Sequence, residues 1–337
     1  TIYLNRNYRS APQILAASNA LIDKNRERLK KELIPVRADN RKPLYFHAKT
    51  STLEADWITA NMRALQEGEE GVSYSSMGVL YRAHYVSRAL EESLIRNKIP
   101  YVLYSGVEFY KRKEIKDVLS YLRMIYNPDD ISFLRTVNEP RRGVGRTRIA
   151  AIKAYAAARG CTLYQALMDN LETDSFRRCK AKDYVRLIEK YRAIFDQMDL
   201  TDLLAGVLHE SGYEQMLRTA GEEERLDNLA ELKQAIFDFT RKAGETVTLG
   251  NYLDHAALFT NMDTGEKAQA VKLMTVHSAK GLEFPVVFVC GLSEGIFPGK
   301  RANTREKLEE ERRLCYVAFT RARDRLFLSD AAGTGYD

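Results

Sequence analysis

The sequence predicts an α/β fold, in which a parallel sheet with helices on both faces is interrupted by an inserted all-helical domain. Two apolar runs, KLMTV and VVFVCGL, flank a polar turn within Val271–Leu292. A half-solvated strand alternates apolar and polar residues, so the unbroken second run is typical of an inner strand buried on both faces. A strand–helix–strand pattern over residues 43–81 and a long helical stretch after residue 106 complete the prediction.

The first part of the predicted sheet domain covers residues 1–105. Apolar residues of Ala11–Asn25 recur at helical spacing, and Ser10 followed by Pro12 is typical of a helix start. Further helices are predicted at Leu53–Gln66 and Ser87–Asn97, and strands at Pro43–His47, Met77–Tyr81 and Pro100–Leu103. Alternation of strand and helix is the pattern of parallel crossover units.

The inserted domain is expected over residues 106–267, where helix follows helix without a convincing strand. Leu229, Leu232 and Ile236, at spacings of three and four, give one of these helices a single apolar stripe. The run DLLAGVLHESGY predicts one helix that ends at Tyr213. The sheet domain resumes over residues 268–337, with a helix at Thr304–Thr320 and a final strand, LFLS.

The composition is that of an ordinary globular protein, with 337 residues, 45% hydrophobic and 29% charged. No apolar run reaches the roughly 18 residues of a membrane span, and the N-terminus does not read as a signal peptide, so we expect a cytoplasmic protein. The four cysteines, Cys161, Cys179, Cys290 and Cys315, lack the close pairs of zinc sites, so no metal site is predicted.

Positive charge is concentrated in one region of the inserted domain. Lys111–Lys153 contains eleven Lys and Arg against five acids, an excess equal to the net charge of +6 of the whole chain. A local basic patch on an otherwise balanced protein is the pattern expected where a protein meets a phosphate backbone.

Two turns are candidate binding sites. The polar turn before VVFVCGL contains His277, Lys280 and Glu283 and is placed either for phosphate or sugar contact or as an ordinary surface loop. In Asn138–Arg148, glycines bracket one small apolar residue, Thr147 is placed to cap the next helix, and four arginines surround the turn. This turn is either an anion site or a simple helix–helix connection with a solvated basic rim.

Several motifs resemble those of superfamily 1 DNA helicases of the UvrD, PcrA and Rep type. TVHSAKGLEFPVVFVCGL resembles motif V, Glu309–Ser329 resembles motif VI, Leu4–Ser10 (LNRNYRS) resembles motif IV and Tyr81–Tyr101 resembles motif IVa. Their order, and the large insertion before motif V, also match. The resemblance implies a RecA-like, P-loop NTPase-like 2A domain with an inserted helical 2B domain, which together form the second half of such a helicase.

The same resemblance implies roles in ATP binding. Tyr8 would stack on the adenine and Glu283 would bind a ribose hydroxyl. Arg9 would reach the γ-phosphate, with a solvated arginine as the alternative. Arg321 would act as an arginine finger on the γ-phosphate. Arg313, in the same motif, is suited instead to an ordinary helical ion pair with a nearby acid such as Glu309.

DNA contacts are also implied. His277 and Lys280 would couple the polar turn to DNA, and Arg82, at the end of a strand, is a further candidate. The glycine turn resembles the hairpin by which the 2B domain holds duplex DNA through its phosphates. Its expected contributors are Gly143, Gly145, Arg141, Arg142 and Arg146.

Two ATPase motifs do not occur in these 337 residues, because there is no GxxxxGK[ST] loop and no DExx acid pair after a suitable strand. The chain also begins without methionine, so we expect a fragment without the 1A and 1B domains, which would hold the phosphate loop and the Mg²⁺ ligands. Such a fragment would be inactive alone. In the full protein we expect ATP-dependent 3′ to 5′ translocation and unwinding.

The expected partners are single-stranded and duplex DNA, the missing domains, and repair or replication proteins. Two alternatives stay open from the sequence. One is the 2A/2B portion of a RecB or AddA type helicase–nuclease, and the other is a DNA-binding module that has lost the motor.

Overall fold

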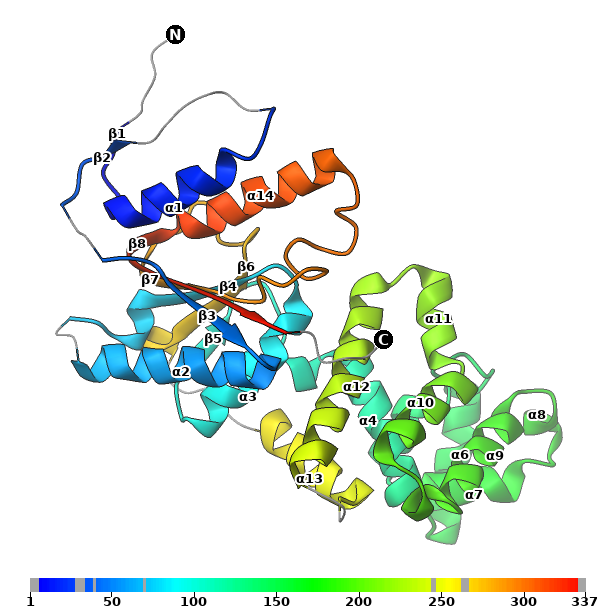
Figure 1. Cartoon of the computed structure of the whole chain (residues 1–337). Coiled ribbons are helices and arrows are strands. Elements are labelled where there is room, and N and C mark those ends of the chain that lie inside the picture. Colours follow the sequence, from blue (N-terminus) through cyan, green and yellow to red (C-terminus); the bar gives the residue numbers. More distant parts are fainter. Residues whose placement is uncertain are drawn as a thin grey trace. The chain divides into compact units, whose positions relative to one another are not determined.

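The computed structural model describes residues 6–27, 34–38, 41–68, 71–243, 247–261 and 267–332. The chain divides into two compact units (Figure 1). Unit 1 comprises residues 1–108 and 262–337, and unit 2 comprises residues 109–261. The second unit is therefore inserted into the chain of the first.

Unit 1 is built on a six-stranded parallel sheet with the strand order β3-β8-β7-β4-β6-β5. The strands are Leu44–Ala48 (β3), Met77–Tyr81 (β4), Tyr101–Leu103 (β5), Val271–Thr275 (β6), Phe284–Val289 (β7) and Ala322–Ala331 (β8). Because β7 pairs with β8 on one side and with β4 on the other, the prediction of an inner strand is confirmed.

Helices cover both faces of this sheet, as Figure 1 shows. Pro12–Ile22 (α1) and Arg305–Phe319 (α14) lie on one face, and Ser51–Gly68 (α2) and Ser87–Arg96 (α3) lie on the other. The predicted α/β fold is therefore confirmed.

The two faces of β7 explain its unbroken apolar sequence. Val287 and Val289 are buried in the core that includes α1 and α14, whereas Val286 and Phe288 are buried in the core that includes α2 and α3. Successive residues of a strand point to opposite faces, so a strand with a core on each face requires apolar residues throughout.

The connection from β6 to β7 crosses the sheet in eight residues, 276–283. Both strands are parallel to β4, so the connection starts at the carboxyl end of β6 and finishes at the amino end of β7. Ala279 is fully buried on the face covered by α1 and α14. Gly281 has a φ of 93°, which a residue with a side chain rarely adopts. One short segment thus places His277 and Glu283 at opposite ends of the sheet.

Unit 2 contains helices and turns and no strand within its described residues, 109–243 and 247–261. The helices are Lys113–Tyr126 (α4), Asp130–Thr136 (α5), Arg146–Arg159 (α6), Leu163–Asn170 (α7), Asp174–Arg177 (α8), Ala181–Arg192 (α9), Leu200–Glu210 (α10), Tyr213–Ala220 (α11), Glu223–Ala243 (α12) and Leu249–Asn261 (α13). The predicted helical character is confirmed. The short α8 was not predicted, because four residues show no periodicity.

One predicted helix end is wrong. The run DLLAGVLHESGY does not form a helix that ends at Tyr213, because α10 ends at Glu210 and Tyr213 begins α11. Gly212 between them has a φ of 74°, and this left-handed residue redirects the chain. None of the helices in the described part of the chain is both long and apolar enough to cross a membrane.

Glu54, in the first turn of α2, is buried beside the end of β7 and accepts a 2.9 Å hydrogen bond from the N–H of Gly291. Burial raises the pKa of Glu54 despite that bond. The folded state therefore keeps the proton to higher pH than the unfolded chain, whose glutamate pKa is about 4.3. Stability consequently falls as the pH rises from that value through the raised pKa.

We expect Glu54→Gln to remove this loss of stability. The variant's free energy of unfolding, relative to that of the parent, should increase as the pH rises from about 4.3 through the raised pKa of Glu54. Urea denaturation can be followed through Trp57, the single tryptophan, which stacks on Phe46 in unit 1. A difference that stays constant with pH would contradict the expected titration.

Candidate functional site

The start of α1 is fixed to the start of β8 by hydrogen bonds. Asn7 Oδ1 accepts bonds from the N–H groups of Arg9 and Ser10, at 3.0 and 2.9 Å, and so forms a tight turn before the helix. Ser10 Oγ donates a 2.7 Å bond to the carbonyl of Ala322, 312 residues away in the chain. These contacts bring Arg9 to the amino ends of β7 and β8.

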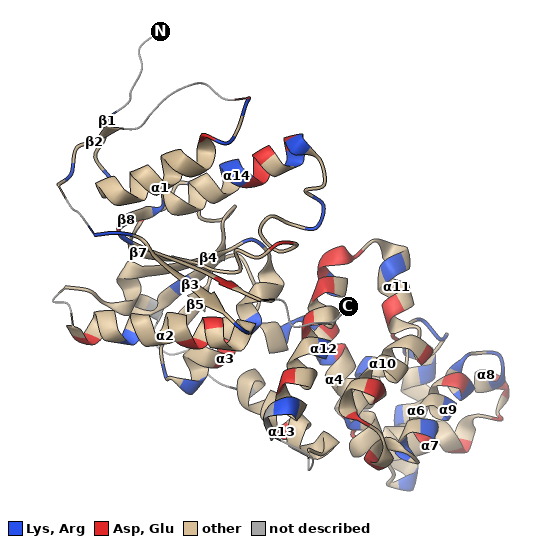
Figure 2. Cartoon of the chain, viewed as in Figure 1, with Lys and Arg blue, Asp and Glu red and all other residues tan. Residues whose placement is uncertain are grey.

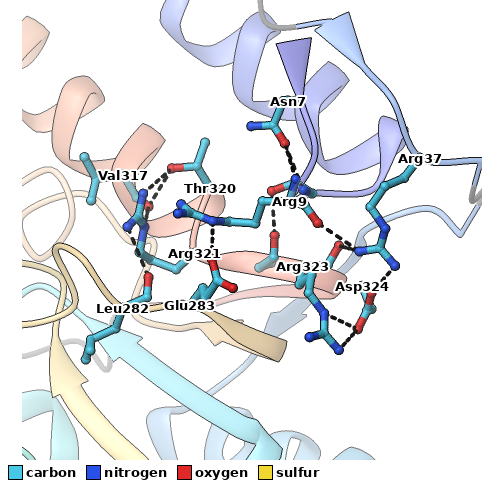
Figure 3. Close-up of polar contacts among 12 residues, drawn as sticks. Asn7, Arg9, Arg37, Leu282, Glu283, Val317, Thr320, Arg321, Arg323 and Asp324 are labelled. Atoms are coloured by element: carbon cyan, nitrogen blue, oxygen red, sulfur yellow. Dashed lines mark hydrogen bonds and ion pairs between the residues drawn. The ribbon is translucent and has the colours of Figure 1, made fainter.

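Glu283 and Arg321 lie at the same end of the sheet. The N–H of Phe284 donates a 3.0 Å bond to the carbonyl of Arg321, which places the neighbouring Glu283 beside the end of α14. Arg9 Nε lies 2.5 Å from Glu283 Oε2 (Figure 3). The structure therefore brings together three of the residues predicted for the ATP site.

The Arg321 guanidinium is held by the protein itself. It donates bonds of 3.1 Å to the carbonyls of Val317 and Leu282 and of 3.3 Å to Thr320 Oγ1 (Figure 3). These bonds use three of its five N–H donors and leave two. Burial, and then the charge of Arg9, lower the pKa of Arg321, while Glu283 opposes the shift.

This group carries an excess of positive charge, because two guanidinium groups face one carboxylate. An anion here would relieve the repulsion between Arg9 and Arg321 that lowers the pKa of Arg321. Glu283 forms an ion pair with Arg9 and is half-exposed. Because a ligand can reach its carboxylate, Glu283 is able to exchange Arg9 for a hydroxyl group of the ligand. Tyr8, the fourth predicted residue, is 67% exposed and precedes Arg9 directly.

Arg37 is a component of this region that the sequence did not predict. It follows a two-residue parallel ribbon in which Ile34–Pro35 (β2) pairs with Arg6–Asn7 (β1). Its Nη1 donates bonds of 2.8 Å to the carbonyl of Arg9 and 3.0 Å to that of Arg323, and its Nη2 lies 2.6 Å from Asp324 Oδ1 (Figure 3). Strands of two residues show no periodicity, so no local signal identifies this contact.

A second group lies at the carboxyl ends of β4 and β6. Arg82, just after β4, binds Glu311 of α14 with two nitrogens, at distances of 2.9 to 3.1 Å. The same carboxylate accepts a 3.2 Å bond from the N–H of Gly299. Burial, and then the charge of Arg82, lower the pKa of His277, while Glu311 opposes the shift. Both effects favour the neutral form of His277 beside a paired arginine.

Three residues predicted to contact DNA therefore differ in their surroundings. His277 lies near Arg82, whose guanidinium is occupied by Glu311. Lys280 is exposed on the crossover between β6 and β7. The connection 276–283 reaches both ends of the sheet, with His277 at one end and Glu283 at the other. Contacts of these residues with DNA stay predictions.

The glycine turn of unit 2 borders a hollow of about 420 Å³. Its lining residues are Asn138, Arg141, Gly143, Gly145, Arg146, Thr147 and Arg148. Gly143 has a φ of 79°, which favours glycine, and the extended Gly145 caps α6. The prediction that Thr147 caps this helix is wrong, because the helix already begins at Arg146 and Thr147 lies within it.

The Asn138 side chain shapes the turn from inside, and the sequence did not predict this role. Its Oδ1 accepts bonds from the N–H groups of Arg142 and Val144, at 2.9 and 3.1 Å. Arg141 and Arg146 are exposed at the rim of the hollow. The turn therefore has the exposed positive charge that an anion site requires.

Arg142 does not belong to that rim. Its side chain is buried, and its guanidinium donates bonds of 3.0 Å to the carbonyl of Thr136 and 3.0 Å to that of Ser211. It also lies over the rings of Tyr121 and Tyr184, at 5.8 and 5.3 Å from their centroids. The prediction that Arg142 adds charge to the surface of the turn is wrong, since these contacts hold it in the interior.

Comparison with known proteins decides the family. The sequence model of the UvrD-like helicase C-terminal domain matches residues 2–333. The chain belongs to this family. The predicted resemblance of the chain to helicases of the UvrD and PcrA type is thereby confirmed.

This UvrD-like helicase C-terminal domain is similar to proteins named ATP-dependent DNA helicase PcrA. It is 37% identical to the protein from Staphylococcus epidermidis over 343 residues and 39% identical to that from Leuconostoc citreum over 347 residues. Each match covers 98% of this chain and 46% of the relative. The chain thus spans about half the length of the curated relatives it matches.

Within the residues that the structure describes, no group of three or more His, Cys, Asp and Glu is placed to hold a metal ion. The pair formed by Arg9 and Arg321 fits the terminal phosphate of a nucleotide, because both are forked donors and the anion would relieve their repulsion. The four cysteines are free thiols.

Proposed function

We propose that this chain is the second motor half of an ATP-dependent DNA helicase, with unit 1 as its RecA-like 2A domain and unit 2 as its 2B domain. The family assignment, and relatives of about twice this length named ATP-dependent DNA helicase, support the proposal. The observation that carries it is the meeting of Arg9 and Arg321 at the amino ends of β7 and β8.

In this proposal the nucleotide binds at that end of the sheet. ATP with Mg²⁺ supplies the phosphoanhydride bond whose hydrolysis drives movement. Arg321 directs its two remaining N–H donors toward the γ-phosphate and stabilises the negative charge that grows in the transition state. Arg9 adds a second cation, and Glu283 turns from Arg9 to a ribose hydroxyl. The exposed ring of Tyr8 stacks on the base.

Hydrolysis also needs groups that these 337 residues do not contain, since neither a GxxxxGK[ST] loop nor a DExx pair occurs in them. In the proposed protein, those groups and the Mg²⁺ ligands belong to the other motor half. Arg9 and Arg321 would then respond to the nucleotide from across the interface between the halves.

DNA binds at two further places in this proposal. The carboxyl ends of β4 and β6, with His277, Lys280 and Arg82, face single-stranded DNA. The glycine turn, with Gly143, Gly145, Arg141 and Arg146, faces the phosphates of duplex DNA. Movement along the single strand is proposed to run 3′ to 5′, as the resemblance to helicases of the UvrD, PcrA and Rep type implies.

The proposal predicts that the 337-residue chain alone does not hydrolyse ATP. Steady-state phosphate release should stay at background with and without single-stranded DNA, because half of the catalytic groups are absent. A protein that joins this chain to a half with the phosphate loop and the DExx acids should show DNA-stimulated turnover. Turnover by the chain alone at the rate of such a protein would exclude the proposed division of the site.

A further inference from the structure

A second basic segment packs against the glycine turn in unit 2. Residues 175–182, which run from α8 through the connection into the first turn of α9, contain four Lys and Arg and no acid. Figure 2 shows Lys and Arg in blue along this connection. Neither the motif resemblance nor the charge count over Lys111–Lys153 includes it, so its place beside the turn emerges only from the fold.

Two hydrogen bonds join this segment to the turn, one from Lys180 and one from Arg148. The N–H of Lys180 donates a 2.9 Å bond to the carbonyl of Arg142. The guanidinium of Arg148 donates to the carbonyl of Gly143, at 2.5 Å, and also to that of Ser175. Backbone groups of both the segment and the turn therefore take part in the hydrogen bonds that join them.

The packing between them is close. A Cβ atom added at Gly143 would lie 3.1 Å from Cys179 Cβ, which is closer than nine in ten real contacts of a Cβ atom. Gly143 thus serves both the left-handed backbone of the turn and the approach of the second segment. The segment is consequently an immediate neighbour of the hollow.

Two of the four basic side chains in this segment are not neutralised by acids. Lys182 pairs with Glu172 at 2.6 Å, and Arg177 lies 4.0 Å from Asp174. Arg178 and Lys180 are exposed and form no ion pair with any acid that the structure describes. They therefore continue the unpaired positive charge of Arg141 and Arg146 beyond the rim of the hollow.

The composition of this surface favours a phosphate backbone over exposed bases. Proteins that bind single-stranded nucleic acid combine positive charge with aromatic rings on which bases stack. Phe176 is the one aromatic residue in Asn138–Arg148 and residues 175–182 together, and it is only 2% exposed. Cations without stacking rings match the dense phosphate array of a double helix.

We propose that Arg178 and Lys180 form a second set of phosphate contacts on duplex DNA, beside those of the glycine turn. The inference rests on the proposed function of the turn and extends it to a segment with no motif. Because both sets contact phosphates alone, binding should depend on salt and hardly on sequence.

The test compares salt titrations of three double variants of the 337-residue chain on a blunt DNA duplex of mixed sequence. They are Arg178→Ala/Lys180→Ala, the turn variant Arg141→Ala/Arg146→Ala, and the control Arg159→Ala/Arg241→Ala. Each removes two positive charges from exposed positions of unit 2. Arg159 lies at the far end of α6, about 20 Å along the helix from Arg146. Circular dichroism verifies that each variant is folded.

For Arg178→Ala/Lys180→Ala we expect the plot of log affinity against log salt to flatten by about 1.8, or about 0.9 for each lost contact. The control should keep the parental slope. If the turn variant flattens the plot and Arg178→Ala/Lys180→Ala behaves as the control, the second set is refuted while the turn keeps its role. If all three variants keep the parental slope, the duplex-binding function of the turn fails together with the inference.

A single-stranded oligonucleotide provides a further comparison. Arg178→Ala/Lys180→Ala should change its affinity for single strands much less than its affinity for the duplex. An equal loss on both would overturn the assignment to duplex DNA and indicate a general attraction for polyanions.

Discussion

Replacement of Arg321 by alanine, in a helicase that contains this chain, is expected to lower the rate of ATP hydrolysis by a factor of about 10³ or more at saturating DNA. An arginine that meets the developing charge on a transferred phosphoryl group contributes at least this much in related nucleotide hydrolases. Arg9→Ala should also cause a large loss, because the two guanidinium groups lie beside the same carboxylate. The measurement is kcat for phosphate release, with KM determined in the same titrations.

Two variants separate catalysis from structure. Arg321→Lys keeps the charge but loses the planar fork, and it should recover little of the rate. Arg323→Ala is the matched control, since this exposed arginine pairs only with the adjacent Asp324 among the residues described, and kcat should stay close to the parental value. Normal hydrolysis by both Arg321→Ala and Arg9→Ala would show that the site is assigned wrongly.

Arg321 also binds the carbonyls of Val317 and Leu282, so its loss could disturb the end of α14. Thermal unfolding of the variant distinguishes the two effects. A rate loss of the expected size with an unchanged melting temperature assigns the effect to the phosphate. A rate loss that follows the fraction of unfolded protein would assign it to stability instead.

Arg142→Ala is expected to destabilise unit 2 by roughly 2–4 kcal/mol. The variant leaves the carbonyl of Ser211 without the donor that Arg142 supplies, and an unsatisfied buried group costs about 1–3 kcal/mol. The carbonyl of Thr136 also loses a donor, but it still accepts a bond from the N–H of Glu139. It also removes the packing of the guanidinium on Tyr121 and Tyr184. Arg141→Ala, one residue earlier on the exposed rim, should change stability by no more than about 0.5 kcal/mol.

The two units can be followed separately in one denaturation experiment. Trp57, the single tryptophan, lies in unit 1, whereas the far-ultraviolet circular dichroism signal includes the helices of unit 2. We expect Arg142→Ala to move the circular dichroism transition to lower urea and to leave the Trp57 fluorescence transition in place. Equal stability of Arg141→Ala and Arg142→Ala would contradict the structural role of Arg142.

The secondary structure of this chain is largely predictable because it follows from local patterns. The apolar run of β7 and the helical spacing of Leu229, Leu232 and Ile236 each reflect burial of the strand or helix that contains them. The ends of the helices were harder to predict than the helices themselves. The end of α10 depends on one left-handed glycine, Gly212, which carries no periodic signal.

The sequence likewise identified some of the functional residues, whereas their contacts with one another were known only from the structure. Motifs IV, V and VI identify Arg9, Glu283 and Arg321 as candidates through resemblance, but no local pattern shows that they meet. Their meeting depends on the bonds from Ser10 to Ala322 and from Phe284 to Arg321, which the topology of the sheet creates. No local sequence pattern predicts the contacts of Arg37 and Glu311, because the partners of these two residues are distant in the chain.

The adjacent pair Arg141 and Arg142 marks the limit of what the sequence by itself determined. The sequence alone established the α/β sheet with a helical insertion, the family and a basic glycine turn. Periodicity and the order of motifs are properties of residues that are close together in the chain. Only the tertiary structure decided that Arg141 faces solvent while Arg142 is buried against the carbonyl of Ser211, 69 residues away. It likewise brought Arg178 and Lys180 to the turn. Whether a charged side chain is buried or exposed depends on the hydrogen-bond acceptors and carboxylates that folding places around it. Those groups belong to distant segments of the chain.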